Sequence, residues 1–339
     1  MANKMTISLC MIVKNEEKDL RRCLSSIYLN VDEIIIVDTG STDNTIEIAE
    51  AYADKLIHYE WNDNFAEARN IGVKEATKDF ILWLDADDVV HDSSKLKQME
   101  LLEDFFYCLK LTNMKNDKKF DTCYQPRIFP NHKGIEFQRR AHESFVDDCI
   151  EQDIKPVYFE DSTEIIHYGY NNSEDLKAKG LRNVKLLQYD MDKYSNRPDY
   201  WLMCGNSYSM AEDYEKALEC YVNAHTVPMA LDPIYTEFKH HSIFVSIKLL
   251  RLLDRENEAF EKAIEAIKDY PYILTQYELG TMYMNKQGYP EDVNIYVKMA
   301  KALFLAVLNN NSENVAIPIC IDEIKASAIR GLKAIGGTE

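Results

Sequence analysis

Phe80-Ile81-Leu82-Trp83-Leu84-Asp85-Ala86-Asp87-Asp88 is the stretch that decides which fold we predict for this 339-residue chain. A short apolar run predicts a buried strand, and this one ends abruptly in three carboxylates. Carboxylates are costly to bury without a partner, so we expect them to face water, a cation or a base. Asp85 and Asp87 are spaced to offer two oxygens to a hard divalent cation. On its own such a triplet is more often a solvated turn. The rest of the sequence is therefore needed to distinguish a metal site from such a turn.

The sequence before this stretch alternates strand patterns with helix patterns. We expect strands over Thr6–Val13, Glu33–Val37, Lys55–Tyr59 and Phe80–Leu84, and helices over Glu17–Tyr28, Asp43–Tyr52 and Phe65–Ala76. This alternation is typical of a parallel sheet, in which ligands bind at the carboxyl ends of the strands. The sequence therefore predicts an α/β, Rossmann-like domain.

The segment from Ser93 to Tyr170 is less regular. We expect a helix near Ser93–Glu100, a strand over Asp104–Thr112, and a hairpin centred on Asn131–Gly134.

Beyond Ser173 the pattern becomes helical and repetitive. The first repeat has the tetratricopeptide spacing, in which small residues let two helices pack closely; it comprises Trp201, Gly205, Tyr208, Ala217, Tyr221, Ala224 and Pro228. A second repeat runs through Leu250, Ala259, Ala263, Ala266 and Pro271, and a third through Leu279, Gly280, Tyr283, Ala300 and Phe304 with an insertion around Asn285–Asn294. Generic antiparallel helix pairs are the alternative. Either way we expect an interaction or assembly surface.

These patterns divide the chain into two domains. We expect an α/β domain over residues 1–172, with a first half over 1–95 and a second over 96–172, followed by an all-α, tetratricopeptide-like domain over 173–339.

Charge and composition exclude several classes of protein. The formal net charge of -18 would repel nucleic acid. No run approaches the roughly 20 apolar residues of a membrane helix, and Ile7–Val13 lacks the features of a secretory leader. The eight cysteines contain no C-x-x-C pair, which indicates reduced, buried thiols. We therefore expect a cytoplasmic protein without an integral membrane segment.

Two further segments are expected at the same edge of the sheet as the aspartates. Val37–Asp43 follows the second strand, and Ala66–Asn70 opens a helix. At such an edge a carboxylate can accept a hydrogen bond from a base, and a helix N-terminus or an arginine can bind phosphate.

At this point the sequence resembles the family 2 glycosyltransferases, which adopt the GT-A fold. The resemblance rests on Cys10–Glu17, Asp38–Asp43, Phe65–Asn70 and Trp83–Asp88, and it continues through Arg127–Phe129, Arg140–Glu143 and Ile166–Tyr170 into the repeats. A transferase domain followed by tetratricopeptide helices is similar to the glycocin S-glycosyltransferase subgroup.

The resemblance implies a role for individual residues. Val13, Asn15 and Glu17 would flank the nucleoside pocket, Asp38 would contact uracil or ribose, Arg69 would lie against base and diphosphate, Asp85 would touch the ribose or metal-bound water, and Asp87 would ligate the metal. Many relatives have a second acid after Asp38, where this chain has Thr39. A hydroxyl and a carboxylate make different demands on a base N–H, which leaves the identity of the base open.

The proton acceptor and a third metal ligand are also implied. Glu143 is our choice for general base, with Asp88 as the alternative; Glu143 could instead form a salt bridge to a neighbouring arginine. His167 would supply the third ligand, unless it is a hydrogen-bonded core residue. We expect His142 to shape the acceptor pocket and Trp83 to belong to the core.

The resemblance thus implies an inverting transferase that moves a hexose from a UDP-sugar with Mg²⁺ or Mn²⁺. The acceptor would be a Cys, Ser or Thr side chain of a peptide or protein, and the repeats would bind it or mediate a homodimer. One alternative is a glycan acceptor in envelope polysaccharide synthesis. Another is a non-catalytic scaffold that only binds a nucleotide-sugar.

Overall fold

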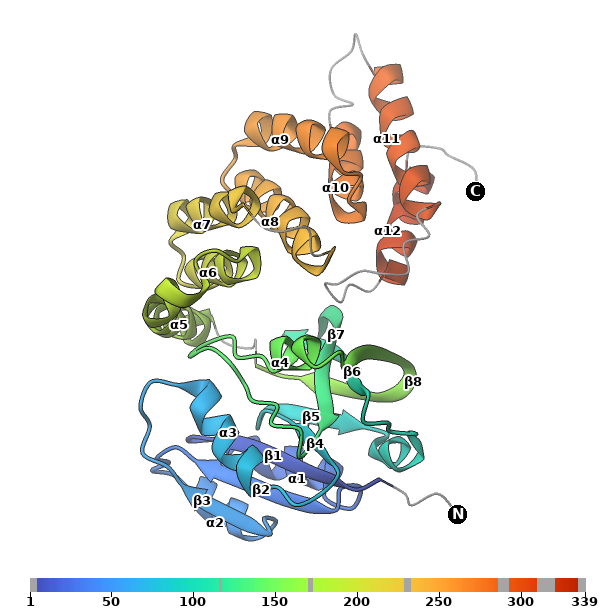
Figure 1. Ribbon diagram of the computed structural model, residues 1–339. Helices are drawn as coiled ribbons and strands as arrows, with labels where there is room; N and C mark the ends of the chain where they lie inside the picture. The colour runs from blue at the N-terminus through green and yellow to red at the C-terminus, as the bar shows by residue number, and fades with distance from the viewer. Residues whose placement is uncertain are drawn as a thin grey trace. The chain divides into compact units, whose positions relative to one another are not determined.

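The computed structural model describes residues 5–115, 118–169, 173–228, 233–285, 293–309 and 321–334 (Figure 1). The chain forms two compact units, one made of Met1–Leu176 with Lys185–Asp190, and the other of Lys177–Val184 with Met191–Glu339. The expected order, an α/β sheet domain followed by an all-α region, is confirmed. The expected boundary at residue 172 lies outside the described residues and stays a prediction.

The first unit is built on one mixed sheet. Within the described residues it has eight strands, in the order β3-β2-β1-β4-β7-β6-β8-β5. The strands are β1 (Ile7–Val13), β2 (Glu33–Asp38), β3 (Lys55–His58), β4 (Phe80–Trp83), β5 (Asp88–His91), β6 (Phe105–Lys115), β7 (Lys118–Pro130) and β8 (Lys155–His167). The first four are parallel, whereas β7 and β6 follow in antiparallel pairs, β8 runs parallel to β6, and β5 is antiparallel to β8.

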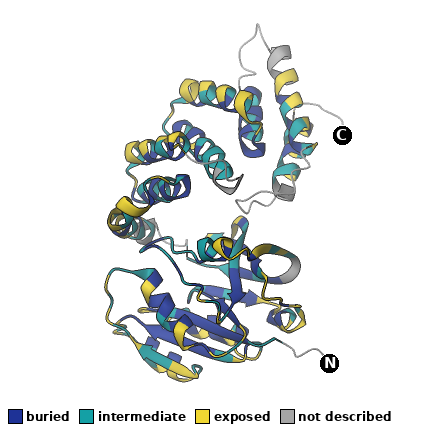
Figure 2. Ribbon diagram, in the orientation of Figure 1, coloured by how far each residue is buried: buried dark blue, intermediate teal, exposed yellow. Residues whose placement is uncertain are grey.

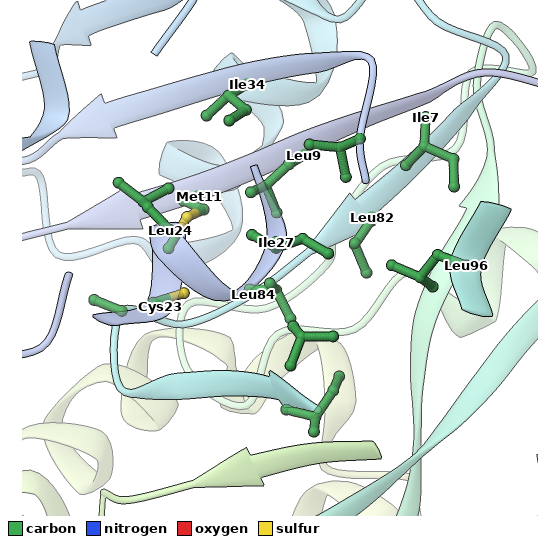
Figure 3. Close-up of a cluster of buried hydrophobic side chains, with 14 of the residues drawn as sticks. Ile7, Leu9, Met11, Cys23, Leu24, Ile27, Ile34, Leu82, Leu84 and Leu96 are labelled. Carbon is green, nitrogen blue, oxygen red and sulfur yellow. The ribbon is translucent and has the colours of Figure 1, made fainter. Parts of the chain in front are cut away.

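Helices cover both faces of this sheet. They are α1 (Leu20–Ile27), α2 (Thr45–Glu50), α3 (Phe65–Glu75), the 3₁₀ helix η1 (Ser93–Gln98) and α4 (Val146–Glu151). Side chains alternate along a strand. Leu9 and Met11 therefore lie beside α1 (Figure 3), in the same apolar cluster as residues of α2, while Cys10 faces α3 on the opposite side. The central strands β1, β2 and β4 are accordingly buried on both faces, whereas the edge strand β3 is partly exposed, as are the outer surfaces of the helices (Figure 2).

Two helices are shorter than expected because polar residues near their N-termini are used in loops. Helix α1 begins at Leu20 rather than Glu17, since residues before it form a turn in which the Leu20 amide donates to the Glu16 carbonyl. Helix α2 begins at Thr45 because the Asp43 carboxylate accepts from the Thr45 amide and hydroxyl instead of joining the helix.

The hairpin expected at Asn131–Gly134 is wrong. Strand β7 ends at Pro130 and pairs with the preceding β6 and with β4. The Asn131 side chain donates to the carbonyls of Ala76 and Lys78, so it fastens the segment to the connection between α3 and β4. In the described chain the only pairing just beyond this point is an isolated bridge between Gln138 and Ser144.

The second unit consists of helices. They are α5 (Ser173–Tyr194), which contributes to both units, α6 (Pro198–Met210), α7 (Tyr214–Thr226), α8 (Pro233–Leu252), α9 (Glu256–Asp269), α10 (Ile273–Asn285), α11 (Val293–Leu308) and α12 (Ile321–Ala334). Gly205 of α6 lies directly against the Tyr221 ring of α7, and Gly280 of α10 against the Phe304 ring of α11. The small residues of the tetratricopeptide-like pattern therefore sit where helices meet closely. Most of the insertion proposed near Asn285–Asn294 lies outside the described residues.

The close packing of α5 on α6 predicts the effect of one substitution. A Cβ added at Gly180 would lie 2.5 Å from the Ala211 amide nitrogen and 2.7 Å from the Ser207 carbonyl oxygen, which are backbone atoms that cannot rotate away. We expect Gly180→Ala to lower the melting temperature, because overpacking costs about 1–3 kcal/mol and outweighs the gain of about 1 kcal/mol in helix propensity.

Gly72→Ala is the matched control. An added Cβ there would meet its nearest neighbour, the Val37 Cγ2, at an ordinary 3.4 Å, so we expect no loss of stability. Equal melting temperatures for Gly180→Ala and the unmodified chain would contradict the close packing.

Candidate active site

The site begins with the short connection between β4 and β5. These strands are four neighbours apart in the sheet order, a distance of about 19 Å if the sheet were flat. The chain from Trp83 to Asp88 can span at most about 17 Å when fully extended, and it contains a turn in which the Asp88 amide donates to the Asp85 carbonyl. The sheet must therefore curl, and β5 returns to α1, where the Val90 amide donates to Ser26 Oγ at 3.0 Å.

This curl gathers three groups suited to a metal ion. Each of Asp85, Asp87 and His167 offers a ligand atom, and these atoms lie within 4.8 Å of one another. The aspartates follow β4, whereas His167 ends β8, directly opposite Asp88 of β5. Burial disfavours the imidazolium, but a hydrogen bond to Asp88 and the charge of Asp87 raise the pKa of His167 above its ordinary value.

Gly169 lies directly against these groups. A Cβ at this position would lie 2.7 Å from Asp87 Oδ2 and closer still to His167 Nε2. A carboxylate oxygen and an imidazole nitrogen of the cluster therefore both face Gly169, where any side chain would collide with them. Two carboxylates and one imidazole are a suitable ligand set for Mn²⁺ or Mg²⁺, so the residues fit a divalent cation.

Arg69 holds the second part of the site together. It lies within α3, only 6% of its surface is exposed, and its guanidinium stacks 4.4 Å from the centre of the Trp83 ring. Its Nη2 donates to Asp85 Oδ1 at 2.7 Å and its Nε to Glu143 Oε1 at 2.6 Å. Partial burial disfavours the charged form of Asp85, but the Arg69 guanidinium lowers the pKa of this carboxyl well below its ordinary value.

Glu143 is carried by a tight loop. The loop closes with reciprocal backbone hydrogen bonds between Gln138 and Ser144, and two residues within it, Arg139 and His142, have left-handed φ angles of 76° and 53°. Such conformations are costly for residues other than glycine and are concentrated at functional sites. Glu143 keeps 13% of its side chain exposed, so it is held in place and still accessible.

Asp88 is completely buried, in contrast to Glu143. Its Oδ2 accepts from the Asp85 amide at 2.9 Å and from Arg127 Nη1 at 2.9 Å, while its Oδ1 lies 2.9 Å from His167 Nδ1. Arg127 is 1% exposed and its guanidinium lies 3.9 Å from the Trp83 ring. Trp83 thus contacts two guanidinium groups within the core, where we expected it.

The residues assigned to the nucleoside pocket lie at the ends of β1 and β2. Val13 is the last residue of β1, and its carbonyl accepts from the Thr39 amide beyond β2. Asp38 is buried and accepts from the amides of Gly40 and Ser41. Asn15, with a left-handed φ of 57°, accepts from the Thr42 amide.

Glu17 completes the link between these two loops. Its carboxylate accepts from the Asn44 amide and side chain, and its own amide donates to Asp43. Asn15 and Glu17 therefore fasten the loop after β1 to the loop after β2.

The structure brings the sequence-derived residues together in two groups. Arg69, Asp85, Asp87, Asp88, Glu143 and His167 form one connected network, and Val13, Asn15, Glu17 and Asp38 lie at the neighbouring strand ends. Sequence reasoning gave no role to Arg127 or Gly169. A lone arginine between Pro126 and the apolar pair Ile128–Phe129 was the available signal for the first.

The position of Arg69 predicts a pH-dependent loss of stability. Arg69→Met leaves two carboxylates without their cation, and we expect the free energy of unfolding to fall by about 2–3 kcal/mol at pH 7, at the low end for buried pairs because Asp85 is partly exposed. The pKa of Asp85 is lowered in the folded state, so its contribution is complete above its unfolded pKa of about 3.9. It is lost as the pH falls further.

Urea unfolding at pH 7 and at pH 3.5 would measure both effects. The difference in the free energy of unfolding between Arg69→Met and the unmodified protein should be smaller at pH 3.5 than at pH 7. Arg21→Met, which changes an exposed arginine of α1, should have little effect at either pH. If Arg69→Met lost the same amount of stability at both pH values, the loss would not come from the charge of Asp85.

None of the helices in the described part of the chain has both the length and the hydrophobicity needed to cross a lipid bilayer.

The chain is similar to known proteins. A TPR repeat-containing protein of Synechococcus elongatus is 41% identical over 150 residues, which are 42% of this chain and 36% of that protein. The SPbeta prophage-derived glycosyltransferase SunS of Bacillus subtilis is 27% identical over 221 residues, 63% of this chain and 52% of that protein.

The chain thus spans about half or less of the length of these two relatives. Among solved structures, glucosyl-3-phosphoglycerate synthase from Mycobacterium tuberculosis aligns with 33% of this chain and 44% of that chain, at 20% identity and a TM-score of 0.27. A similarity this low does not indicate which residues of this chain form the site.

The sequence motifs and the sheet agree with one family model, Glycosyl transferase family 2, which matches residues 8–152. The matched range contains all but the first residue of β1, the strands β2 to β4, Arg69, the three aspartates and Glu143. Residues 8–152 of this chain therefore form a family 2 glycosyltransferase domain.

Proposed function

We propose that this chain is a metal-dependent glycosyltransferase that moves a hexose from a UDP-sugar to an acceptor with inversion. The observation that carries the proposal is the Asp85–Asp87–His167 cluster beside Gly169, joined through Arg69 to Glu143. A cation site and a carboxylate at a second position are what a single displacement from a nucleotide-sugar requires.

Asp87 and His167 would hold Mg²⁺ or Mn²⁺, with Asp85 contacting the ribose or metal-bound water. A bound cation would supply compensation for the charge on the departing diphosphate. Arg69 donates from one guanidinium to Asp85 and to Glu143, so it would orient both carboxylates relative to the bound donor.

Glu143 is the better supported general base. Its Oε2 makes no hydrogen bond with the described residues, and its side chain is partly exposed. Asp88 is fully buried and both its oxygens are engaged, so an acceptor hydroxyl or thiol would have no access to it. A thiol acceptor would demand less of the base, because its pKa is near 8.5.

The nucleoside would bind at the ends of β1 and β2. Val13 and Asp38 would line its pocket. Asn15 and Glu17 would shape the pocket through their hydrogen bonds to the loop after β2. Uracil is the base we propose for the donor.

The acceptor we propose is a Cys, Ser or Thr side chain of a peptide or protein. The support is the helical unit, whose closely packed pairs follow the tetratricopeptide pattern. Repeats of this kind present extended surfaces suited to binding chains. The unit would bind the acceptor or a second copy of the protein.

Asp87→Ala tests the cation site. We expect Mn²⁺ affinity and Mn²⁺-dependent hydrolysis across a panel of nucleotide-sugars to fall about a hundredfold or more, because even partners of metal ligands contribute 10–100-fold. The comparison uses titration calorimetry for the metal and nucleotide release for the reaction.

Asp104→Asn, which alters an exposed carboxylate outside the cluster, should behave like the unmodified protein. Turnover without metal, or an unimpaired Asp87→Ala, would count against the proposed site. Tight UDP binding without hydrolysis or transfer would favour a scaffold, and transfer to glycans but not peptides would favour envelope polysaccharide synthesis.

Glu143→Gln tests the general base separately. We expect transfer to an acceptor to slow by about 10²–10⁴-fold, while Mn²⁺ and UDP affinities stay within a few-fold, because the amide oxygen can still accept from Arg69. Glu136→Gln changes a half-exposed glutamate that pairs with Lys74 before the same loop, and it should leave transfer unchanged. A rapid Glu143→Gln enzyme would exclude Glu143 as the base.

A further inference from the structure

We propose that Asp88 and Arg127 are positioning residues, which fix the His167 ring with Nδ1 toward Asp88 and Nε2 toward the cation site. The proposal deepens the proposed function and rests on it for the role of the cation. It assigns a purpose to a buried ion pair that contacts neither the donor nor the acceptor.

The strand register places Asp88 and His167 together. They are opposite residues of the antiparallel pair β5 and β8, and side chains of opposite residues lie on the same face of a sheet. Asp88 is also held against the turn that follows β4, because the Asp85 amide donates to Asp88 Oδ2. A rigid carboxylate therefore stands beside the imidazole.

Arg127 determines which oxygen of Asp88 is left for the histidine. Oδ2 accepts both the Asp85 amide and Arg127 Nη1, whereas Oδ1 is the oxygen 2.9 Å from His167 Nδ1. Arg127 is in turn fixed by its contact with the Trp83 ring and by donating to the Trp83 carbonyl at 3.3 Å. The carboxylate cannot rotate without breaking these bonds.

The other side of the imidazole faces the cluster. Nε2 and Asp87 Oδ2 are the two atoms nearest to the position that a Cβ of residue 169 would occupy. Nδ1 also lies 3.3 Å from Asp87 Oδ1, but the Asp88 oxygen is nearer and fully buried. A histidine that donates Nδ1–H to a carboxylate presents the lone pair of Nε2, which is the arrangement that carboxylate partners give metal-binding histidines.

Stability alone is a poor reason to keep this pair. Asp88 and Arg127 are 0% and 1% exposed, and the cost of desolvating two charges can exceed their mutual attraction. Apolar residues of similar volume often give equal or greater stability at such positions. An arrangement that orients a neighbouring functional side chain explains the pair better.

The tautomer of His167 in the unmodified, metal-free chain is the first test. The ¹⁵N spectrum of histidine-labelled protein at a pH where the ring is neutral distinguishes a protonated Nδ1 from a protonated Nε2. The His167→Asn spectrum identifies the signals among the eight histidines. We expect a protonated Nδ1; a protonated Nε2 would overturn the proposal, whether or not any variant folds.

Asp88→Asn and Arg127→Lys give the second test. We expect Mn²⁺ affinity, measured by calorimetry or by the electron paramagnetic resonance of free Mn²⁺, to fall about 10–100-fold in Asp88→Asn and by less in Arg127→Lys, which keeps the charge. The His167 signals should shift toward a mixture of tautomers in both. Asp104→Asn is the matched control for the same chemical change at an exposed position.

Two outcomes would overturn the proposal in folded variants. One is unchanged Mn²⁺ affinity and an unchanged tautomer in Asp88→Asn. The other is a tautomer that responds to Asp87→Ala but not to Asp88→Asn, which would make Asp87 the partner of Nδ1. If the unmodified chain bound no Mn²⁺ at all, the proposed function would fail, whereas the tautomer would still decide the positioning role.

Discussion

The short connection between β4 and β5 is the constraint on which the site depends. A chain of this length cannot cross a flat sheet, so the sheet curls until its last strand meets α1. The same curl carries β8 to the aspartates, because β8 is the neighbour of β5. His167, which lies far from the aspartates in the sequence, thereby comes close to Asp85 and Asp87. The local sequence of the loop thus determines a long-range arrangement.

A polar chain runs through the interior that this curl creates. From Glu143 it passes through Arg69 to Asp85, and from Arg127 through Asp88 to His167. Trp83 lies against both guanidinium groups and joins the two parts. Apolar clusters on both faces of the sheet keep water from the buried pair Asp88 and Arg127, so each of these two charges depends on its partner. These hydrogen bonds connect the side chains of the site without any bound ligand.

Sequence reasoning succeeded where the information is local. The bounds of β1 to β4 and the aspartates at the end of β4 follow from apolar runs and turn residues. It failed at Asn131, whose side chain bonds to carbonyls more than fifty residues earlier, and it gave no role to Arg127. The importance of Gly169 depends on side chains that only folding brings near it. Pairings across such separations leave no periodic pattern to detect.

The balance of charge at the site has a consequence for the order of ligand addition. Four carboxylates, from Asp85, Asp87, Asp88 and Glu143, surround the guanidinium groups of Arg69 and Arg127. Even with a protonated His167 the cluster is negative. A pyrophosphate approaching the metal-free protein would therefore be repelled at short range, and the proposed enzyme would take up its divalent ion before, or together with, the nucleotide.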